Sequence, residues 1–255
     1  MMNPNGTDIV QITSGQYWHN NGRWSPDASK IVCNTEEGTT TAGIEMAVFN
    51  SEGNNRIFLG WGNQMSWTPD GSKIIFSYLQ GAEVGIISYK LYSIDYDGKN
   101  RIVISDKYAG GQAISPDGSK IIFPFNEDSL FGVVILNFPQ FDNPLFIYTG
   151  STGAYDLNWS PEGKEIIFSR RETSSELNSI FIMNSDGTNI SKIINNKSSL
   201  SYKYPFFSSD ANRIIFLGIS LDGTQKSYLF TANKDGTDLH LVINDASVTS
   251  CDWSK

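Results

Sequence analysis

The sequence predicts an all-β fold, a six-bladed β-propeller whose blades are four-stranded antiparallel sheets. Three observations predict it. One motif returns at a nearly constant interval along the chain of 255 residues. Each interval carries strand and turn signals for four short strands, and the two ends of the chain match different parts of the same repeat. A period of about 40–50 residues with this content is typical of radially repeated blades.

The repeat is anchored by an aromatic or aliphatic residue that precedes a tight turn and a β-branched run. Clear copies are "WTPDGSKIIF" from Trp67, "ISPDGSKIIF" from Ile114 and "WSPEGKEIIF" from Trp159. Proline fixes φ at about −65° and glycine permits the left-handed conformation, so the motif predicts a turn between two strands. The six anchors lie 43, 47, 45, 48 and 46 residues apart, at Trp24, Trp67, Ile114, Trp159, Phe207 and Trp253.

A second hairpin closes most repeats. The segment "SIFIMNSDGTN" from Ser179 predicts a third strand with an Asp-Gly turn, and "ISKII" predicts the fourth strand. In the third repeat, "NFPQFDNP" from Asn137 replaces the Asp-Gly turn, which predicts a distorted blade edge. No helical periodicity competes with this pattern. A stack of β-sandwiches is the structural alternative, but it would not explain one motif at one period.

The chain ends complete the prediction. The segment "MMNPNGTDIVQI" from Met1 aligns residue for residue with "IMNSDGTNISKI" from Ile182. The chain therefore starts in a third strand and ends just after a first strand. We expect a single domain over residues 1–255, with five complete blades and a sixth that is split between the termini and lacks its second strand. Pairing of the terminal strands would cover two open edges. A five-bladed ring with extra terminal strands is the alternative.

Composition limits the classes of partner. The formal net charge is −8 and the sequence has no Lys/Arg cluster, so we expect no nucleic-acid binding. No apolar run approaches the roughly 20 residues that span a bilayer. The N-terminus has no basic segment followed by an apolar one. We therefore expect no membrane insertion.

The residues needed for common catalytic sites are scarce. The chain has two histidines, His19 and His240, and no Gly-x-Ser-x-Gly elbow of an α/β-hydrolase. Two imidazoles are few for a transition-metal site. The "DYDGKN" segment from Asp95 resembles the start of an EF-hand loop, but the twelfth position is Asp106 rather than glutamate, so a hairpin turn is the better interpretation. We expect no catalytic residue, no metal site and no cofactor, and hence no enzyme.

Several conspicuous side chains have a structural explanation. The turn carboxylates recur once per repeat, so we expect them to bond the backbone amides of the turns; they are Asp27, Asp70, Asp117, Glu162 and Asp210. The anchor tryptophans are expected to pack between blades. Cys33 stands where other repeats have phenylalanine and is expected to be a small buried hydrophobe. A disulfide between Cys33 and Cys251 remains open.

The repeats resemble a known family. The combination of Trp-Ser-Pro-Asp-Gly, Lys-Ile-Ile-Phe and "IFIMNSDGTN" is similar to the WD-like repeats of TolB-type propellers, over essentially the whole chain. The resemblance implies a protein-binding module that is periplasmic or associated with the cell surface of a bacterium. Similar repeats occur in prolyl-oligopeptidase-like enzymes and in some pectin-degrading lyases, so the fold does not determine the activity.

The loops between a fourth strand and the next first strand are rich in aromatic residues. Aromatics beside Gly, Ser and Asn are typical of recognition surfaces, although such rings would also serve to fill the mouth of a central channel. His19 and Asp156 would add polarity to this set. The predicted partner or ligand site consists of Tyr17, Trp18, His19, Trp61, Gln64, Tyr108, Tyr155, Asp156, Tyr202 and Tyr204.

We therefore expect a non-catalytic binding module that uses this aromatic face as a scaffold for protein–protein interaction. One alternative is a propeller that binds carbohydrate or another small ligand, because aromatic rings with Asn and Gln also suit sugars. A second alternative is a propeller fragment of a larger prolyl-oligopeptidase-like or lyase-like enzyme. The expected partner is a protein, with a carbohydrate as the other possibility.

Overall fold

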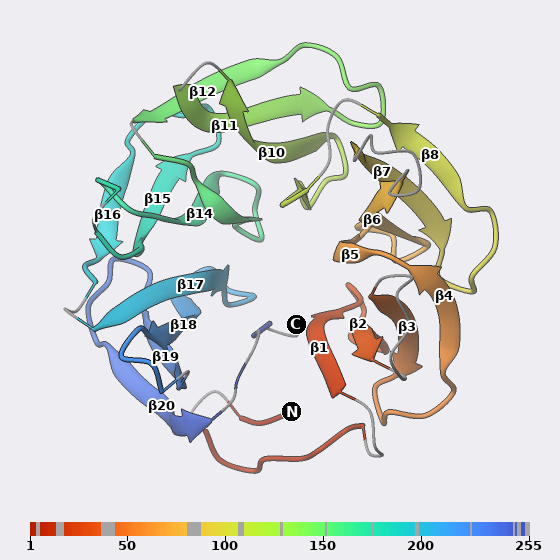
Figure 1. Cartoon of the computed structure of the whole chain (residues 1–255), viewed down its shortest axis with the longest axis horizontal. Coiled ribbons are helices and arrows are strands. Elements are labelled where there is room, and N and C mark those ends of the chain that lie inside the picture. Colours follow the sequence, from red (N-terminus) through yellow and green to blue (C-terminus); the bar gives the residue numbers. More distant parts are fainter. Residues whose placement is uncertain are drawn as a thin grey trace. The chain divides into compact units, whose positions relative to one another are not determined.

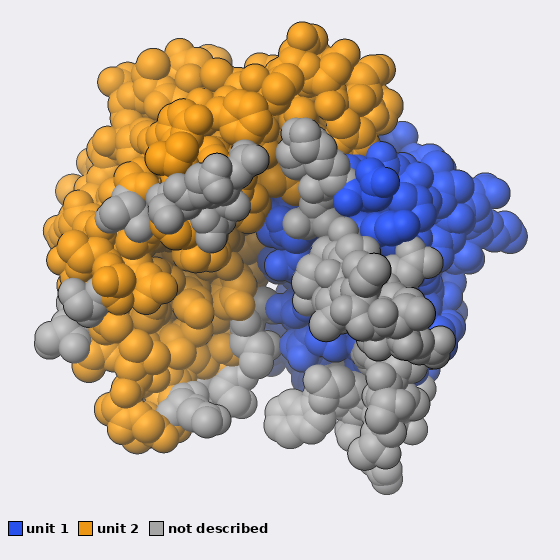
Figure 2. Space-filling view, turned by 45° about the horizontal axis from the view of Figure 1, so that its top comes forward, with its two compact units in different colours: residues 1–3, 7–112, 254–255 blue, residues 4–6, 113–253 orange. Residues whose placement is uncertain are grey.

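The computed structural model describes residues 1–3, 6–13, 18–36, 44–80, 88–106, 110–127, 130–150, 152–174, 176–196, 199–224, 226–246, 248 and 251–252. These residues form twenty β-strands. The chain divides into two compact units (Figure 2). Unit 1 comprises Met1–Asn3, Thr7–Gln112 and Ser254–Lys255, and unit 2 comprises Pro4–Gly6 and Ala113–Trp253. Each unit is described below by itself.

Unit 1 contains two four-stranded antiparallel sheets, each with its strands in sequence order (Figure 1). The strands of the first sheet are β1 (Trp18–Trp24), β2 (Lys30–Glu36), β3 (Glu45–Asn50) and β4 (Ile57–Trp61). Those of the second sheet are β5 (Asn63–Trp67), β6 (Lys73–Gln80), β7 (Ser88–Asp95) and β8 (Ile102–Ser105).

Unit 2 contains three sheets of the same order and direction. The strands of the first are β9 (Ala113–Ile114), β10 (Lys120–Glu127), β11 (Leu130–Asn137) and β12 (Leu145–Gly150). The second sheet has β13 (Tyr155–Trp159), β14 (Glu165–Arg170), β15 (Ser179–Asn184) and β16 (Ser191–Ile194). The third has β17 (Leu200–Phe207), β18 (Arg213–Ser220), β19 (Ser227–Asn233) and β20 (His240–Ala246). These five sheets confirm the predicted four-stranded antiparallel blades.

The predicted number of blades is wrong, because the structure has five four-stranded sheets and the described terminal residues form no sixth. Residues 1–3 and 6–13 make only a hairpin. The N-terminal ammonium of Met1 donates to the carbonyl of Val10 at 2.6 Å, and the amide of Val10 donates to the carbonyl of Met1 at 2.7 Å. In the alignment of the repeats these two residues correspond to Ile182 and Ser191, which pair between β15 and β16. A hairpin of this kind has no second strand along its inner edge, and a blade needs that strand to connect its inner and outer halves.

The Ile-Ile-Phe run makes the second strand the most buried part of a sheet. In β14 the side chains of Ile166, Ile167 and Phe168 are fully buried, and they alternate between two clusters. Ile166 and Phe168 pack in the cluster that includes Ile122 of the preceding sheet, whereas Ile167 packs in the cluster that includes Tyr202 of the following sheet. Each such side chain stabilises the fold by about 1.5–3 kcal/mol, so sheet-on-sheet packing holds unit 2 together.

Two anchor tryptophans confirm the predicted packing between blades. The indole N–H of Trp67 donates to the carbonyl of Arg23 at 3.0 Å. The indole N–H of Trp159 donates to the carbonyl of Ala113 at 3.2 Å. Each acceptor lies one residue before the anchor of the preceding repeat. The anchors therefore combine apolar burial with one directional bond to the neighbouring first strand.

The turn aspartates act as predicted at four of the five turns. Asp27, Asp70, Asp117 and Asp210 each accept a hydrogen bond of 3.0–3.1 Å from the amide two residues later. Each also accepts a 2.6 Å bond from the hydroxyl two residues earlier. These bonds, led by those from Ser115 and Ser208, lower the pKa of Asp117 and of Asp210 to about 2. Glu162 makes no such bond within the part of the chain described.

The turn of the third repeat is irregular, as predicted, but its strands are not disrupted. The Phe138–Pro139 peptide bond is cis, and Phe141 and Asn143 have φ values of 57° and 47°. β12 nevertheless pairs with β11 from Leu145 to Gly150. The short element of this sheet is its first strand, β9, which has two residues.

Both cysteines are free, buried thiols, which answers the question left open by the sequence. Cys33 packs against Ala47 and Phe49, and burial raises the pKa of its thiol to about 12. Its predicted role as a small buried hydrophobe is confirmed. The Cys251 thiol donates a hydrogen bond to the carbonyl of Tyr204 at 3.2 Å.

Candidate functional site

Three positions before the anchor of each of the five sheets stands a residue with a left-handed backbone, within the first strand in four sheets and just before β9 in the other. The strand register shifts at these positions in four of the sheets. A bulge of this kind turns side chains away from the regular alternation of a strand. Its cost for a non-glycine residue is about 1–2 kcal/mol, so the blade geometry must impose it. The residues are Asn21, Gln64, Gly111, Asp156 and Tyr204, with φ between 53° and 67°.

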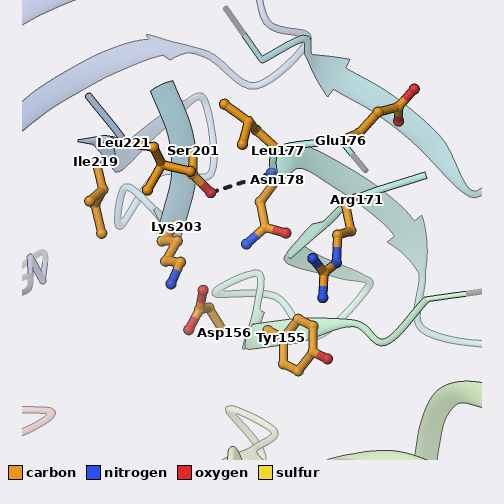
Figure 3. Close-up of a pocket in the computed structure, with 10 residues that line it drawn as sticks. All are labelled: Tyr155, Asp156, Arg171, Glu176, Leu177, Asn178, Ser201, Lys203, Ile219 and Leu221. Atoms are coloured by element: carbon orange, nitrogen blue, oxygen red, sulfur yellow. Dashed lines mark hydrogen bonds between the residues drawn. The ribbon is translucent and has the colours of Figure 1, made fainter. Parts of the chain in front are cut away.

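A pocket of about 390 Å³ lies beside two of these bulges, between the β13–β16 and β17–β20 sheets of unit 2 (Figure 3). This volume falls within the range of about 300–1,000 Å³ that is usual for ligand pockets. Side chains from both sheets and from the loops after β14 and β18 line it. They are Tyr155, Asp156, Arg171, Glu176, Leu177, Asn178, Ser201, Lys203, Ile219 and Leu221.

Asp156 is held in place from two sides. Its Oδ2 accepts a 2.6 Å hydrogen bond from the hydroxyl of Ser169, a fully buried residue of β14. The same oxygen lies 3.3 Å from the backbone amide of Tyr204 in the next sheet, which also donates to it. Oδ2 therefore links β14 to the next sheet, whereas Oδ1 accepts no hydrogen bond from the described residues. Figure 3 shows the carboxylate turned to the side of the pocket from which Lys203 enters.

The loop after β14 is fastened to the next sheet by backbone groups of Asn178. Its amide donates to the hydroxyl of Ser201 at 3.3 Å, and its carbonyl accepts from the amide of Tyr202 at 2.9 Å. The Asn196 side chain adds a 2.5 Å bond to the carbonyl of Leu177. These bonds fix the backbone and leave the side-chain amide of Asn178 directed into the pocket (Figure 3).

Two cations line the pocket without a carboxylate partner among the described residues. The Lys203 ammonium forms no hydrogen bond or ion pair there, and the Arg171 guanidinium donates only to the carbonyl of Ser174, at 3.3 Å. Figure 3 shows both groups turned into the pocket, whereas the Glu176 carboxylate points away from it. The pocket therefore offers unused N–H donors.

Tyr155 places an aromatic ring at the rim. Its side chain is 43% exposed. The ring lies over Gly153, because a β-carbon at that glycine would be 2.8 Å from the tyrosine hydroxyl. Glycine thus leaves room for the ring position seen here. An exposed ring over an open pocket can stack on an incoming group.

The structure brings together only part of the predicted site. Tyr155, Asp156 and Tyr204 lie at or beside the pocket. Tyr202 is instead fully buried in the core of unit 2, where burial raises the pKa of its phenol and its hydroxyl has no hydrogen-bond partner among the described residues.

The predicted residues of unit 1 are placed separately. Trp61 ends β4, stacks edge-on against Phe58 at 6.2 Å, and has a buried indole N–H without a partner in the described structure. Gln64 is exposed at its bulge. The His19 ring packs edge-on against Phe49 at 5.5 Å. Tyr17 and Tyr108 lie outside the described residues, as does the side chain of Trp18, whose backbone begins β1.

The sequence-based prediction missed most of the polar lining. Arg171 and Asn178 lie at the two ends of the variable loop between a second and a third strand, and Lys203 stands between two tyrosines of the aromatic segment. The predicted site was defined mainly by aromatic residues and therefore did not include these three. The sequence signal that could have identified Lys203 is its positive charge within an aromatic segment of an acidic chain.

Two further observations concern the described residues only. No helix among them has the length and hydropathy to cross a membrane. They also contain no group of three or more His, Cys, Asp or Glu side chains arranged to hold a metal ion.

Sequence comparison finds no matching protein family and no matching curated protein. Solved structures do match. A putative TolB from Agrobacterium tumefaciens has a TM-score of 0.72 at 16% identity, over 93% of this chain and 86% of that one. TolB from Acinetobacter baumannii has a TM-score of 0.77 at 16% identity, over 98% of this chain and 61% of that one. An oligogalacturonate lyase in complex with manganese has a TM-score of 0.55 at 12% identity, over 88% of this chain and 65% of that one.

The protein therefore belongs to the β-propeller class of all-β folds. Within that class its fold is TolB-like, as the repeat motifs predicted. At 16% identity this likeness concerns the fold, and any activity has to be argued from the site.

Proposed function

We propose that the protein is a non-catalytic binding module whose contact site is the pocket between the β13–β16 and β17–β20 sheets, together with the ring of Tyr155. The observation that carries the proposal is a pocket with a fixed backbone and unused polar side chains. The Asn178 backbone and Asp156 are anchored by bonds to the adjoining sheet. The side-chain amide of Asn178 and the Lys203 ammonium line the pocket without a hydrogen bond to the described residues. Groups ordered in advance lose little entropy on binding.

A protein partner is the occupant we favour. The TolB-like fold supports this choice by resemblance, and so does an exposed aromatic ring next to apolar and charged groups, which is typical of interface anchors. The same resemblance supports a periplasmic or cell-surface location. Fractionation of the producing cells, followed by immunodetection, tests the location: recovery in the cytosolic fraction alone would contradict it.

A photo-crosslinking experiment tests the site. A benzophenone amino acid is placed at Tyr155 in one variant and at Tyr96, an exposed tyrosine on the β7–β8 turn, in a control variant. We expect a discrete adduct in the producing cells from position 155 that is absent from position 96. The same adducts at both positions, or no adduct at position 155, would contradict the proposed site.

Carbohydrate is the second candidate, because Tyr155 and the Asn178 amide together offer a stacking face and hydrogen bonds that suit a sugar. A thermal-shift titration with neutral oligosaccharides distinguishes it. A ligand at 100 times its dissociation constant stabilises a fold by about 2.7 kcal/mol, which such a titration detects. Saturable stabilisation that Tyr155→Ala abolishes would favour the sugar. The lyase likeness supports no catalytic proposal, since it concerns the fold alone.

A further inference from the structure

We infer that this pocket binds the carboxyl terminus of a peptide whose last residue is aliphatic. The inference rests on the proposed function and specifies the ligand of the same site. It combines three features of the lining: two cations without carboxylate partners, an acceptor and a donor positioned for a peptide group, and an aliphatic wall.

Lys203 and Arg171 differ from the basic side chains of unit 2 that form internal ion pairs. Lys192 pairs with Glu172 at 2.5 Å, Lys234 with Glu165 at 2.8 Å and Arg213 with Asp238 at 2.9 Å. Lys203 has no such partner among the described residues, although the chain carries a net charge of −8. An ammonium that faces a pocket and lacks an internal counter-ion is a ready site for an anionic group.

Arg171 adds a second donor from the opposite side of the pocket. Its guanidinium spends one N–H on the carbonyl of Ser174 and retains others. Its backbone is tied down because its carbonyl accepts a hydrogen bond from Thr152. A planar guanidinium suits a carboxylate, which presents two acceptor oxygens in one plane. Figure 3 shows Arg171 and Lys203 reaching the pocket from different sheets.

The remaining polar groups fit the peptide unit beside a terminal carboxylate. Asp156 has one oxygen engaged by Ser169 and Tyr204, so its Oδ1 is available to an incoming N–H. The Asn178 side-chain amide is available to an incoming carbonyl. A ligand that consisted of an anionic group alone would bring its negative charge close to the Asp156 carboxylate, with no N–H donor between the two. A peptide terminus supplies that donor.

The third feature is apolar. Leu177, Ile219 and Leu221 line the pocket, and Leu221 is 60% exposed. An aliphatic side chain placed against them would remove apolar surface from water, at about 25 cal/mol per Å² buried. Acidic sugars and inorganic anions would pair with the cations but leave the three aliphatic side chains exposed to water. The lining as a whole therefore favours a C-terminal Leu, Ile or Val.

The test uses two short peptides that differ only at the terminus. N-acetyl-Gly-Ala-Leu with a free carboxylate and the same peptide with a C-terminal amide are titrated into the isotope-labelled full chain, and binding is followed by NMR chemical shifts. We expect the carboxylate peptide to bind at least about tenfold more tightly than the amide, corresponding to 1.4 kcal/mol. A third peptide with a C-terminal serine should bind more weakly, because it cannot cover the aliphatic wall.

Two variants assign the effect to the pocket. Lys203→Gln should weaken binding of the carboxylate peptide about tenfold and that of the amide peptide by a much smaller factor. Lys164→Gln removes the same charge from an exposed turn outside the pocket and should change neither. A thermal melt of each variant confirms that it is folded. Equal affinities for carboxylate and amide, an unchanged affinity in Lys203→Gln, or no binding at millimolar peptide would each overturn the inference.

These outcomes are separable from failure of the proposed function. Peptide binding at the pocket that ignores the carboxylate would overturn the terminal-carboxylate inference and leave a binding module in place. A crosslink at position 155 without any peptide binding would do the same. Loss of the crosslink together with absence of peptide binding would overturn both.

Discussion

The carboxylate of Asp156 accepts a hydrogen bond from the backbone amide of Tyr204 at 3.3 Å, and the two residues occupy the same bulge position in consecutive sheets of unit 2. The bond joins two first strands through one side chain. It also places the free oxygen of Asp156 beside the pocket. The bulge thus links the repeated framework of the blade to the proposed contact site.

Replacing Asp156 tests this connection. Asp156→Ala removes the acceptor for the buried Ser169 hydroxyl and for the Tyr204 amide, and it puts alanine at φ 55°. We expect the free energy of unfolding to fall by about 2–3 kcal/mol. Asp156→Asn keeps an acceptor and tolerates a left-handed backbone, so it should lose less than about 1 kcal/mol. Urea unfolding measures both, and equal losses would contradict the assigned role.

The tryptophan hydrogen bonds give a second prediction. Trp159→Phe leaves the Ala113 carbonyl without its 3.2 Å donor, so we expect a loss of about 1–3 kcal/mol beyond the lost packing. Trp61→Phe is the matched control, because its buried indole N–H has no partner among the described residues and its removal costs no bond. Urea unfolding of the two variants should show the larger loss at Trp159. The reverse order would be inconsistent with this account.

The glycine of the Glu52-Gly53 turn between β3 and β4 gives a third prediction. Gly53 has φ 81°, and a β-carbon there would lie 1.8 Å from the carbonyl oxygen of Ile12. Gly53→Ala should therefore displace the N-terminal hairpin as well as strain the turn. Gly223 has φ 86° with open space around it, so Gly223→Ala should cost only the strain, about 1–2 kcal/mol. Hydrogen exchange at Val10 should accelerate in the first variant alone; unchanged exchange would refute the contact.

Acid stability gives a fourth prediction. Hydrogen bonds from Ser115 and Ser208 lower the pKa of Asp117 and Asp210 to about 2, from an ordinary value of 3.8. A lowered folded-state pKa stabilises the fold above the unfolded value, and that contribution is lost as the pH falls. The melting temperature should therefore drop between about pH 4 and pH 2. Asp117→Asn and Asp210→Asn should flatten this drop, and a double variant with the unchanged profile would contradict the assignment.

The sequence alone determined the repeated architecture. The anchors such as Trp67, the Ser-Pro-Asp-Gly turns and the Ile-Ile-Phe runs act over a few residues, and local turn chemistry with alternating burial specifies strands and hairpins. For the same reason the turn role of Asp117 and the burial of Cys33 were predicted correctly. The alignment of Met1 with Ile182 also gave the N-terminal hairpin, but not the absence of a complete sixth sheet.

Only the tertiary structure decided which polar and aromatic residues share a pocket. Tyr202 and Tyr204 stand two positions apart, yet one is buried in the core and the other lies at a bulge whose left-handed backbone interrupts the alternation of the strand. Arg171 and Lys203 are 32 residues apart in sequence and line one pocket because consecutive sheets pack face to face. Local sequence pattern carries no record of such packing, since it depends on side chains from two separate blades at once.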